Sequence, residues 1–153
     1  MTELQPFDVD ELAENIWVST FGIPLIPTPT SELEQNVKLC TGLVHITGEW
    51  SGAVVLRCSE AIAKRGATLM FGMPAGEVTG DDIRDVVCEL ANMTGGTVKS
   101  VLPGSCFLSL PTFVEGNDYR VGLPSGCAES AHYYEADGEP VMIRIIEAPI
   151  GRE

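Results

Sequence analysis

The pattern that most restricts the fold of this chain is the helical periodicity of residues 79–102. Its apolar side chains recur at intervals of three and four residues, so they fall on one face of an α-helix. They are Ile83, Val86, Val87, Leu90 and Thr94. Thr79 followed three residues later by Asp82 is typical of a capping box, which marks the start of the helix. The segment therefore predicts a helix that packs its apolar face on the protein core.

The opposite face of this predicted helix carries Asp85, Glu89 and Asn92 within about 60° of each other over two turns. Charged residues opposite an apolar stripe are typical of a solvated helix face. Asparagine is unfavourable inside a helix because its amide competes for backbone hydrogen bonds. Asn92 therefore indicates either a functional ridge or a helix end before Gly95-Gly96, since each glycine costs roughly 1 kcal/mol inside a helix. The periodicity leaves open whether the helix stops at Gly95 or continues to Leu102.

Length and charge restrict the class of protein and its partners. The 153 residues predict a single domain spanning residues 1–153, and the hydrophobic fraction of 44% is that of a globular protein. Nine basic residues against 22 acidic ones give a net charge of −13. Nucleic acids and anionic membranes require a basic surface, so neither is expected as a partner. An acidic surface favours a partner that exposes a cation.

The five cysteines are scattered and odd in number, without a CxxC pair, so neither a disulfide framework nor a zinc site is expected. They are Cys40, Cys58, Cys88, Cys106 and Cys127. Isolated cysteines of this kind are typical of buried thiols in a reducing compartment. The first 17 residues lack the basic and apolar regions of a secretion signal, and no run is long enough to span a membrane. We expect a cytoplasmic protein without a metal site of its own.

The remaining sequence predicts two more helices and six strands. The helices are expected at residues 8–21 and 60–70, the second capped by Ser59. The prolines at 24, 27 and 29 predict an extended connector after the first helix. Strands are expected at 43–46, 53–57, 106–110, 112–114, 131–136 and 141–146, with a loop at 117–129.

The order of these elements predicts the fold class. A helix followed by a hairpin occurs near the start of the chain, and the central helix is likewise followed by strands. This order predicts a mixed α+β fold, in which helices pack on a largely antiparallel sheet and which contains a weak internal duplication. The apolar strand at 53–57 is expected near the middle of the sheet, covered on both faces.

The central helix resembles a known active site. Asp85-x-x-x-Glu89-x-x-Asn92 is similar to the signature of the CheC/CheX/FliY phosphatases of bacterial chemotaxis. The flanking segments ELANMTGGTVKSVLPG and FLSLPTFVEG resemble the family's motif helix, connector and strand. The segment ITGEWSGAVVLRCSEAIAKRGATLMFG resembles its strand–turn–strand–helix unit, so the resemblance extends over residues 8–147. It implies a CheC-like fold.

Two departures from the family pattern accompany this resemblance. The first helix has Asp10 and Glu14 at the matching positions, but Trp17 replaces the asparagine. A single motif copy in the later helix is the CheX-type pattern, whereas CheC-type members carry two. Pro111, which matches the family's downstream proline, lies closer to Asn92 than the family pattern leads us to expect.

The resemblance implies a protein phosphatase that acts on the phospho-aspartate of a CheY-like response-regulator receiver domain. By resemblance, Asn92 orients the attacking water and Glu89 pairs with the receiver's lysine. Asp85 matches the first motif position, and its role is either to orient the ridge or to contact the rim of the partner. An amide does not titrate near neutral pH, so Asn92 is not expected to act as a general base. The receiver would supply Mg²⁺, so no cofactor of this chain's own is expected. A homodimer formed edge to edge is also implied.

Two alternatives remain open from the sequence. The first is a non-catalytic module of the same fold that binds a receiver or a flagellar-switch partner. The second is an unrelated α/β domain with another ligand. The sequence contains no phosphate-binding loop and no Ser-His-Asp set that would favour the second alternative.

Overall fold

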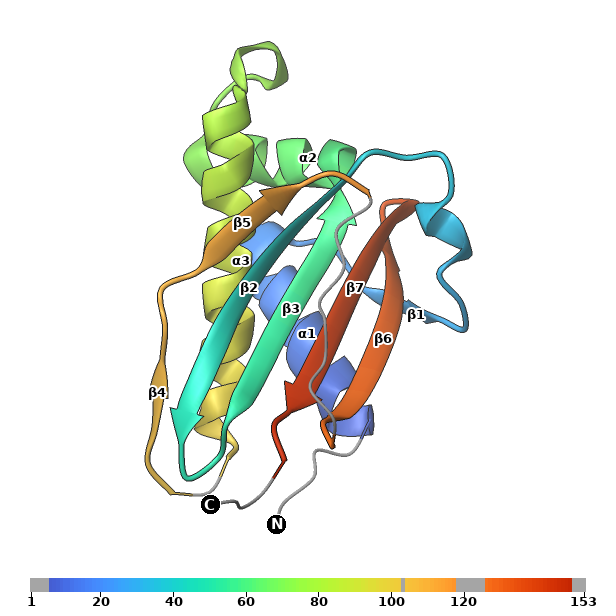
Figure 1. Cartoon of the computed structure of the whole chain (residues 1–153). Helices are drawn as coiled ribbons and strands as arrows, with labels where there is room; N and C mark the ends of the chain where they lie inside the picture. Colours follow the sequence, from blue (N-terminus) through green and yellow to red (C-terminus); the bar gives the residue numbers. More distant parts are fainter. Residues whose placement is uncertain (1–5, 103, 118–125, 150–153) are drawn as a thin grey trace.

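The computed structural model describes residues 6–102, 104–117 and 126–149, and Figure 1 shows their arrangement. Its helices are α1 (Pro6–Phe21), α2 (Glu60–Phe71) and α3 (Gly80–Ser100). Its strands are β1 (Ile26–Thr28), β2 (Leu39–Gly48), β3 (Gly52–Ser59), β4 (Cys106–Leu108), β5 (Thr112–Glu115), β6 (Ala128–Ala136) and β7 (Glu139–Glu147). Short 3-10 turns lie at Glu32–Glu34 and Ala75–Glu77. Within the described ranges, no helix is long and apolar enough to cross a membrane.

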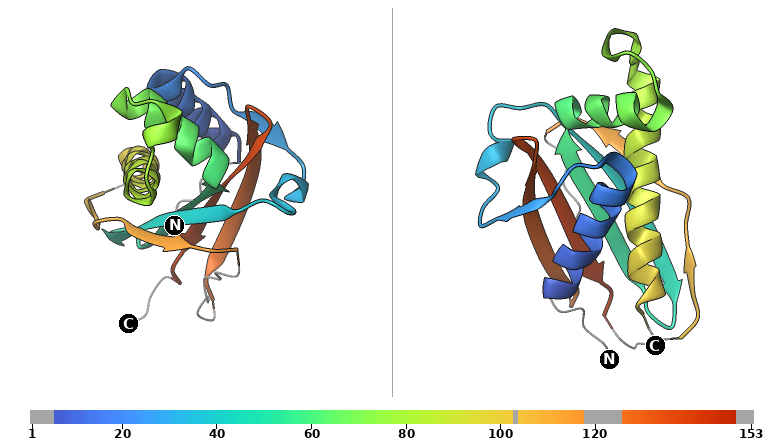
Figure 2. Two further views of the ribbon diagram at one scale, coloured as in Figure 1. Left: turned by 90° about the horizontal axis from the view of Figure 1, so that it is seen from above. Right: turned by 180° about the vertical axis from the view of Figure 1, so that it is seen from behind.

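The strands form one antiparallel sheet in the order β1-β6-β7-β3-β2-β4, with β5 also paired to β2. The three helices cover one face of this sheet (Figure 2). The core lies between the two layers and includes Val44, Val54, Leu56, Val86 and Leu90. The predicted α+β class is therefore confirmed, and β3 lies in the middle of the sheet as expected.

The strand order is that of an internally duplicated chain. One half contributes α1, β1, β2 and β3, and the other contributes α3, β4 with β5, β6 and β7. The first strand of each half pairs with the second strand of the other half. In one case β1 pairs with β6, and in the other β4 and β5, which together take the place of a first strand, pair with β2. The last strands of the two halves, β3 and β7, meet at the centre. Exchanging the halves therefore leaves the strand order unchanged.

Helix α3 continues through Gly95 and Gly96 to Ser100, which settles the question that the sequence left open. Glycine is required at position 95 because a Cβ atom there would lie 2.4 Å from Val44 Cγ2. On the strand below, a Cβ atom at Gly42 would lie 2.9 Å from Val87 Cγ1. Two glycines thus let α3 approach β2 closely, and Asn92 lies well inside the helix rather than at its end.

This close approach predicts opposite effects for alanine at two adjacent glycines. Gly95→Ala is expected to lower the free energy of unfolding by about 1–3 kcal/mol because its methyl group overlaps Val44. Gly96→Ala is the matched control, since its nearest contact would be Leu108 at 4.0 Å. It is expected to raise the free energy by up to about 1 kcal/mol through better helix propensity. Urea unfolding measures both, and equal stabilisation would contradict the packing of α3 on β2.

The structure corrects several predicted boundaries. The proline connector contains β1, which the sequence analysis missed, and β1 is an edge strand in which Pro27 needs no ladder partner for its nitrogen. Strands β2, β3, β6 and β7 are longer than predicted, and α1 begins at Pro6. Strand β6 begins at Ala128, so the last two residues of the loop expected at 117–129 belong to a strand. The strand expected at 106–110 ends at Leu108. Most of the loop expected at 117–129 lies outside the described residues.

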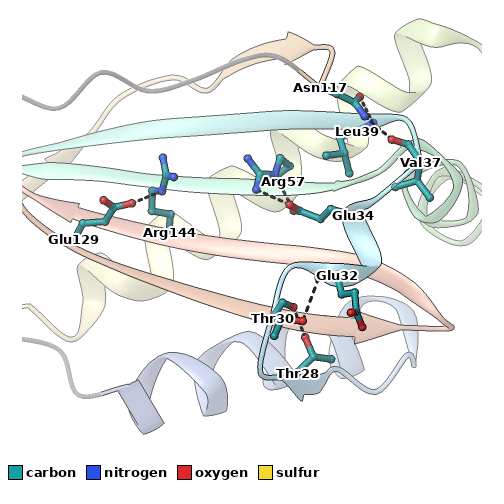
Figure 3. Close-up of polar contacts among 10 residues, drawn as sticks. All are labelled: Thr28, Thr30, Glu32, Glu34, Val37, Leu39, Arg57, Asn117, Glu129 and Arg144. Atoms are coloured by element: carbon teal, nitrogen blue, oxygen red, sulfur yellow. Dashed lines mark hydrogen bonds and ion pairs between the residues drawn. The ribbon is translucent and has the colours of Figure 1, made fainter.

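Side-chain contacts join separate elements of the structure to the sheet (Figure 3). Arg57 of β3 donates two hydrogen bonds to the Glu34 carboxylate, at 2.7 and 2.8 Å. Asn117 Oδ1 accepts a hydrogen bond of 2.9 Å from Leu39 N, at the start of β2. These contacts fix the 3-10 turn and the segment after β5 against the sheet, on which α3 is packed.

Candidate functional site

The start of α3 is fixed by the predicted capping box. Thr79 Oγ1 accepts a hydrogen bond from Asp82 N at 3.3 Å, and Asp82 Oδ2 accepts one from Thr79 N at 2.9 Å. Val86, Val87, Leu90 and Thr94 are then buried, as the periodicity predicts. Burial of this face sets the rotation of the helix. The polar ridge, formed by Asp85, Glu89 and Asn92, is therefore directed away from the core.

The ridge lines an open groove of about 590 Å³. Seen from above, helix α3 is flanked by the C-terminal end of α2 and by the β4–β5 segment (Figure 2, left). The groove is lined by Met70 and Phe71 of α2, by Asp85, Cys88, Glu89, Asn92 and Met93 of α3, and by Leu110 and Pro111 between β4 and β5. The structure therefore brings Asp85, Glu89 and Asn92 together in one groove. Pro111 also lines this groove, although it follows Asn92 at a shorter sequence spacing than the family pattern leads us to expect.

The polar groups of the groove are free to meet a partner. Asp85 and Glu89 are exposed and Asn92 is half-buried. Within the described residues, these three side chains make no hydrogen bond or ion pair. The adjacent Arg84 guanidinium is directed to Asp81, at 3.4 Å. The groove thus presents two uncompensated carboxylates and a neutral amide, and none of its lining side chains is cationic.

Cys88, the thiol of the groove, is half-buried and not activated. Burial raises its pKa; the Arg84 cation opposes this rise and the Asp85 carboxylate reinforces it. A thiol that stays protonated is a poor nucleophile. In the ranges that the structure describes, no three His, Cys, Asp or Glu side chains gather to hold a metal ion.

This set of side chains limits the chemistry that the groove can do. The Asn92 amide can orient a water molecule by hydrogen bonding but cannot take its proton. The Glu89 carboxylate can pair with a cation. Since the groove lining carries no cation to hold an anionic substrate, a phosphorylated substrate would have to bring its own compensating positive charges.

The equivalent positions of α1 form no comparable site. The Tyr134 hydroxyl donates a hydrogen bond of 2.6 Å to Asp10 Oδ1. Trp17 stands at the asparagine position, is only 1% exposed, and packs edge-on against Phe21. The first helix therefore uses two of its three motif positions, Asp10 and Trp17, to hold the fold together, so these positions are not free to meet a partner.

The contact between Tyr134 and Asp10 predicts a pH-dependent contribution to stability. Burial, together with the hydrogen bond and charge of Asp10, raises the Tyr134 pKa far above its usual value near 10. The proton is held more tightly in the folded state, so this contribution is complete below about pH 10 and is lost as the pH rises further. Tyr134→Phe is expected to cost about 1 kcal/mol at neutral pH and to reduce the alkaline loss. Urea unfolding at pH 7 and pH 10.5 tests this.

The apolar walls of the groove were missed by the sequence analysis. Met70, Phe71 and Leu110 come from segments distant in sequence from the motif, and no periodicity joins them to it. The sequence contained only indirect signs of these walls. Pro111 interrupts a predicted strand next to Leu110, and Phe71 is the last residue of α2 before Gly72 ends the helix.

Comparisons with known proteins agree with this fold. A family model described as "Chemotaxis phosphatase CheX" matches residues 40–135. The chemotaxis protein CheX from Vibrio vulnificus is similar with a TM-score of 0.75 and 17% identity, covering 95% of this chain and 98% of that chain. A CheX–CheY–BeF3–Mg complex from Borrelia burgdorferi is similar with a TM-score of 0.68 and 12% identity, covering 95% of this chain and 99% of that chain. FliY from Thermotoga maritima is similar with a TM-score of 0.60 and 18% identity, covering 96% of this chain and 93% of that chain. A search of curated proteins finds no match.

Proposed function

This chain belongs to the CheX family of chemotaxis phosphatases, and from this we infer that it dephosphorylates the phospho-aspartate of a CheY-like receiver domain. The observation that carries the proposal is the groove on α3, in which Glu89 and Asn92 lie side by side with no partner among the described residues. The Borrelia burgdorferi neighbour supports the choice of substrate, because it is a CheX bound to CheY with BeF3 and Mg²⁺.

The proposed reaction needs little from this chain except placement. An acyl phosphate is already reactive, and a receiver would bring its own Mg²⁺ and lysine to offset the charge of the phosphoryl group. Asn92 holds a water molecule in line with the phosphorus. The water oxygen forms a bond to phosphorus, the bond between phosphorus and the aspartyl oxygen breaks, and the aspartate leaves as a carboxylate. The products are the free aspartate and inorganic phosphate, and the water proton passes to phosphate or solvent.

Glu89 is the proposed docking residue. It lies one helical turn before Asn92, and a rigid helix fixes the separation of the two side chains. A carboxylate at this position can pair with the receiver's lysine and draw it away from the phosphoryl group. Asp85 lies one turn further toward the start of α3 and is exposed. We assign it a contact with the partner at the rim of the groove.

A homodimer formed edge to edge is part of the same proposal. The described sheet has two edges, one at β1 and one at β4 with β5. An edge strand offers unpaired backbone groups that a second copy can satisfy. Light scattering at micromolar concentration tests this, since a dimer has twice the 16.4 kDa mass of the chain.

The function is tested by following phosphate loss from a purified, phosphorylated receiver with and without the wild-type protein. Acceleration that saturates with protein concentration supports a phosphatase. If phosphate loss is not accelerated but the receiver binds in a pull-down, the protein is a non-catalytic receiver-binding module. Absence of both effects with a panel of receivers contradicts the proposal.

A further inference from the structure

We propose that Phe71 and Leu110 form an apolar clamp that grips the receiver on either side of its phosphorylation site and sets affinity rather than rate. This inference rests on the proposed function, because it names which side chains of the groove select the partner. Both residues line the groove, and neither belongs to the polar ridge. Leu110 is 88% exposed and Phe71 is 46% exposed.

The backbone of Leu110 is held in place by the hydrogen bonds of Ser109 before it and by the strand pairing of Thr112 after it. Ser109 N donates a hydrogen bond to His45 O, and Ser109 Oγ accepts one from His45 N, each at 2.9 Å. Ser109 Oγ also donates to Leu110 O at 2.9 Å. Pro111 then restricts the backbone of Leu110 to extended conformations, and Thr112 rejoins the sheet opposite Leu43. Because the backbone that carries Leu110 is already fixed, little backbone entropy is lost when a partner covers this side chain.

Phe71 stands on the other side of α3. It is the last residue of α2, and Gly72 follows it with a positive φ of 66° and donates a backbone hydrogen bond of 3.0 Å to Thr68 O. This helix end fixes the backbone from which the ring projects. Met70, Met93 and Pro111 also belong to the apolar part of the groove lining. The two elements that flank α3 thus each bring one exposed apolar residue to the groove, and both residues are carried on an anchored backbone.

The arrangement of charge and apolar surface specifies the occupant. Two carboxylates without a cationic partner in the groove lining, Asp85 and Glu89, share the groove with Phe71 and Leu110. The surface that fits them must present a cation flanked by apolar side chains. A receiver would present its lysine at the phosphorylated aspartate, so the clamp is continuous with the proposed catalytic contact. A clamp that touches only the flanks of the site contributes equally to substrate and transition state, and so changes affinity without changing the saturating rate.

The test measures the saturating rate and the half-saturating concentration of phosphate loss for Leu110→Ala, Phe71→Ala and Leu110→Asp. The alanine variants are expected to raise the half-saturating concentration about tenfold each, with the saturating rate within about twofold of wild type. Leu110→Asp is expected to have a larger effect on affinity. Val101→Ala and Val101→Asp are the matched controls, because Val101 is also 46% exposed but lies beyond the end of α3, outside the groove lining.

Each outcome decides between the possibilities. Unchanged half-saturation for the Phe71 and Leu110 variants overturns the clamp and leaves the phosphatase proposal standing, because wild type still accelerates phosphate loss. A fall in molar mass of free Leu110→Asp by light scattering overturns the clamp by assigning Leu110 to contact with a second copy. Failure of wild type to bind or dephosphorylate any receiver overturns the proposed function and the clamp together. A lower saturating rate at unchanged half-saturation also contradicts the clamp.

Discussion

Asn92→Ala is expected to reduce the saturating rate of receiver dephosphorylation by about 100-fold or more, close to spontaneous decay. The reason is geometric: without the amide, the attacking water has no fixed position opposite the leaving oxygen. The half-saturating concentration should stay within about twofold of wild type, because Glu89, Asp85 and the apolar walls remain. Single-turnover phosphate loss over a range of protein concentrations separates the two quantities.

Two further variants sharpen this test. Asn15→Ala removes an exposed asparagine from α1, outside the groove, and should leave both quantities unchanged. Asn92→Gln keeps the amide but moves it outward by one methylene group, about 1.5 Å, which should also misplace the water and lower the rate. A wild-type saturating rate for Asn92→Ala would show that Asn92 does not position the water.

Glu89→Lys is expected to raise the half-saturating concentration at least tenfold, because the substitution places an ammonium group opposite the receiver's lysine. The rate at saturation should also fall, since that lysine is no longer drawn away from the phosphoryl group. Binding of the variant to a receiver in the presence of fluoroberyllate and Mg²⁺ measures the affinity without turnover. Normal binding and catalysis by this variant would refute the pairing.

The matched control for Glu89 is Glu14→Lys, which makes the same change in net charge at an exposed position on α1. If long-range attraction by the acidic surface accounts for binding, both variants weaken it equally, and the difference from wild type shrinks as salt is raised. If a local ion pair accounts for binding, Glu89→Lys binds the receiver much more weakly than Glu14→Lys does at every salt concentration. The second result is expected.

The sequence alone predicted the parts of the fold that depend on local chemistry. The apolar period of α3 and the capping pair Thr79 and Asp82 each act within a few residues of chain. For the same reason the ridge Asp85, Glu89 and Asn92 could be placed on one face of a helix. Helical periodicity fixes relative direction along a single element, whatever the element packs against.

The features that could not be predicted depend on contacts between distant segments. The passage of α3 through Gly95 depends on its approach to Val44, which lies about fifty residues earlier. Strand β1 depends on pairing with β6 across most of the chain, and Pro27 obscured it. The groove likewise required Phe71 and Leu110 to be placed on either side of the motif by α2 and by the Ser109–His45 bonds. No periodicity within one segment contains this information.

The most direct measurement is the position of the Asn92 amide in a structure of this protein bound to a receiver with fluoroberyllate and Mg²⁺. We predict that Asn92 lies at hydrogen-bond distance, about 3 Å, from a water molecule in line with beryllium. Glu89 should pair with the receiver's lysine in the same structure. A complex in which the receiver binds another face, or in which Asn92 is directed away from the fluoroberyllate group, would contradict the account.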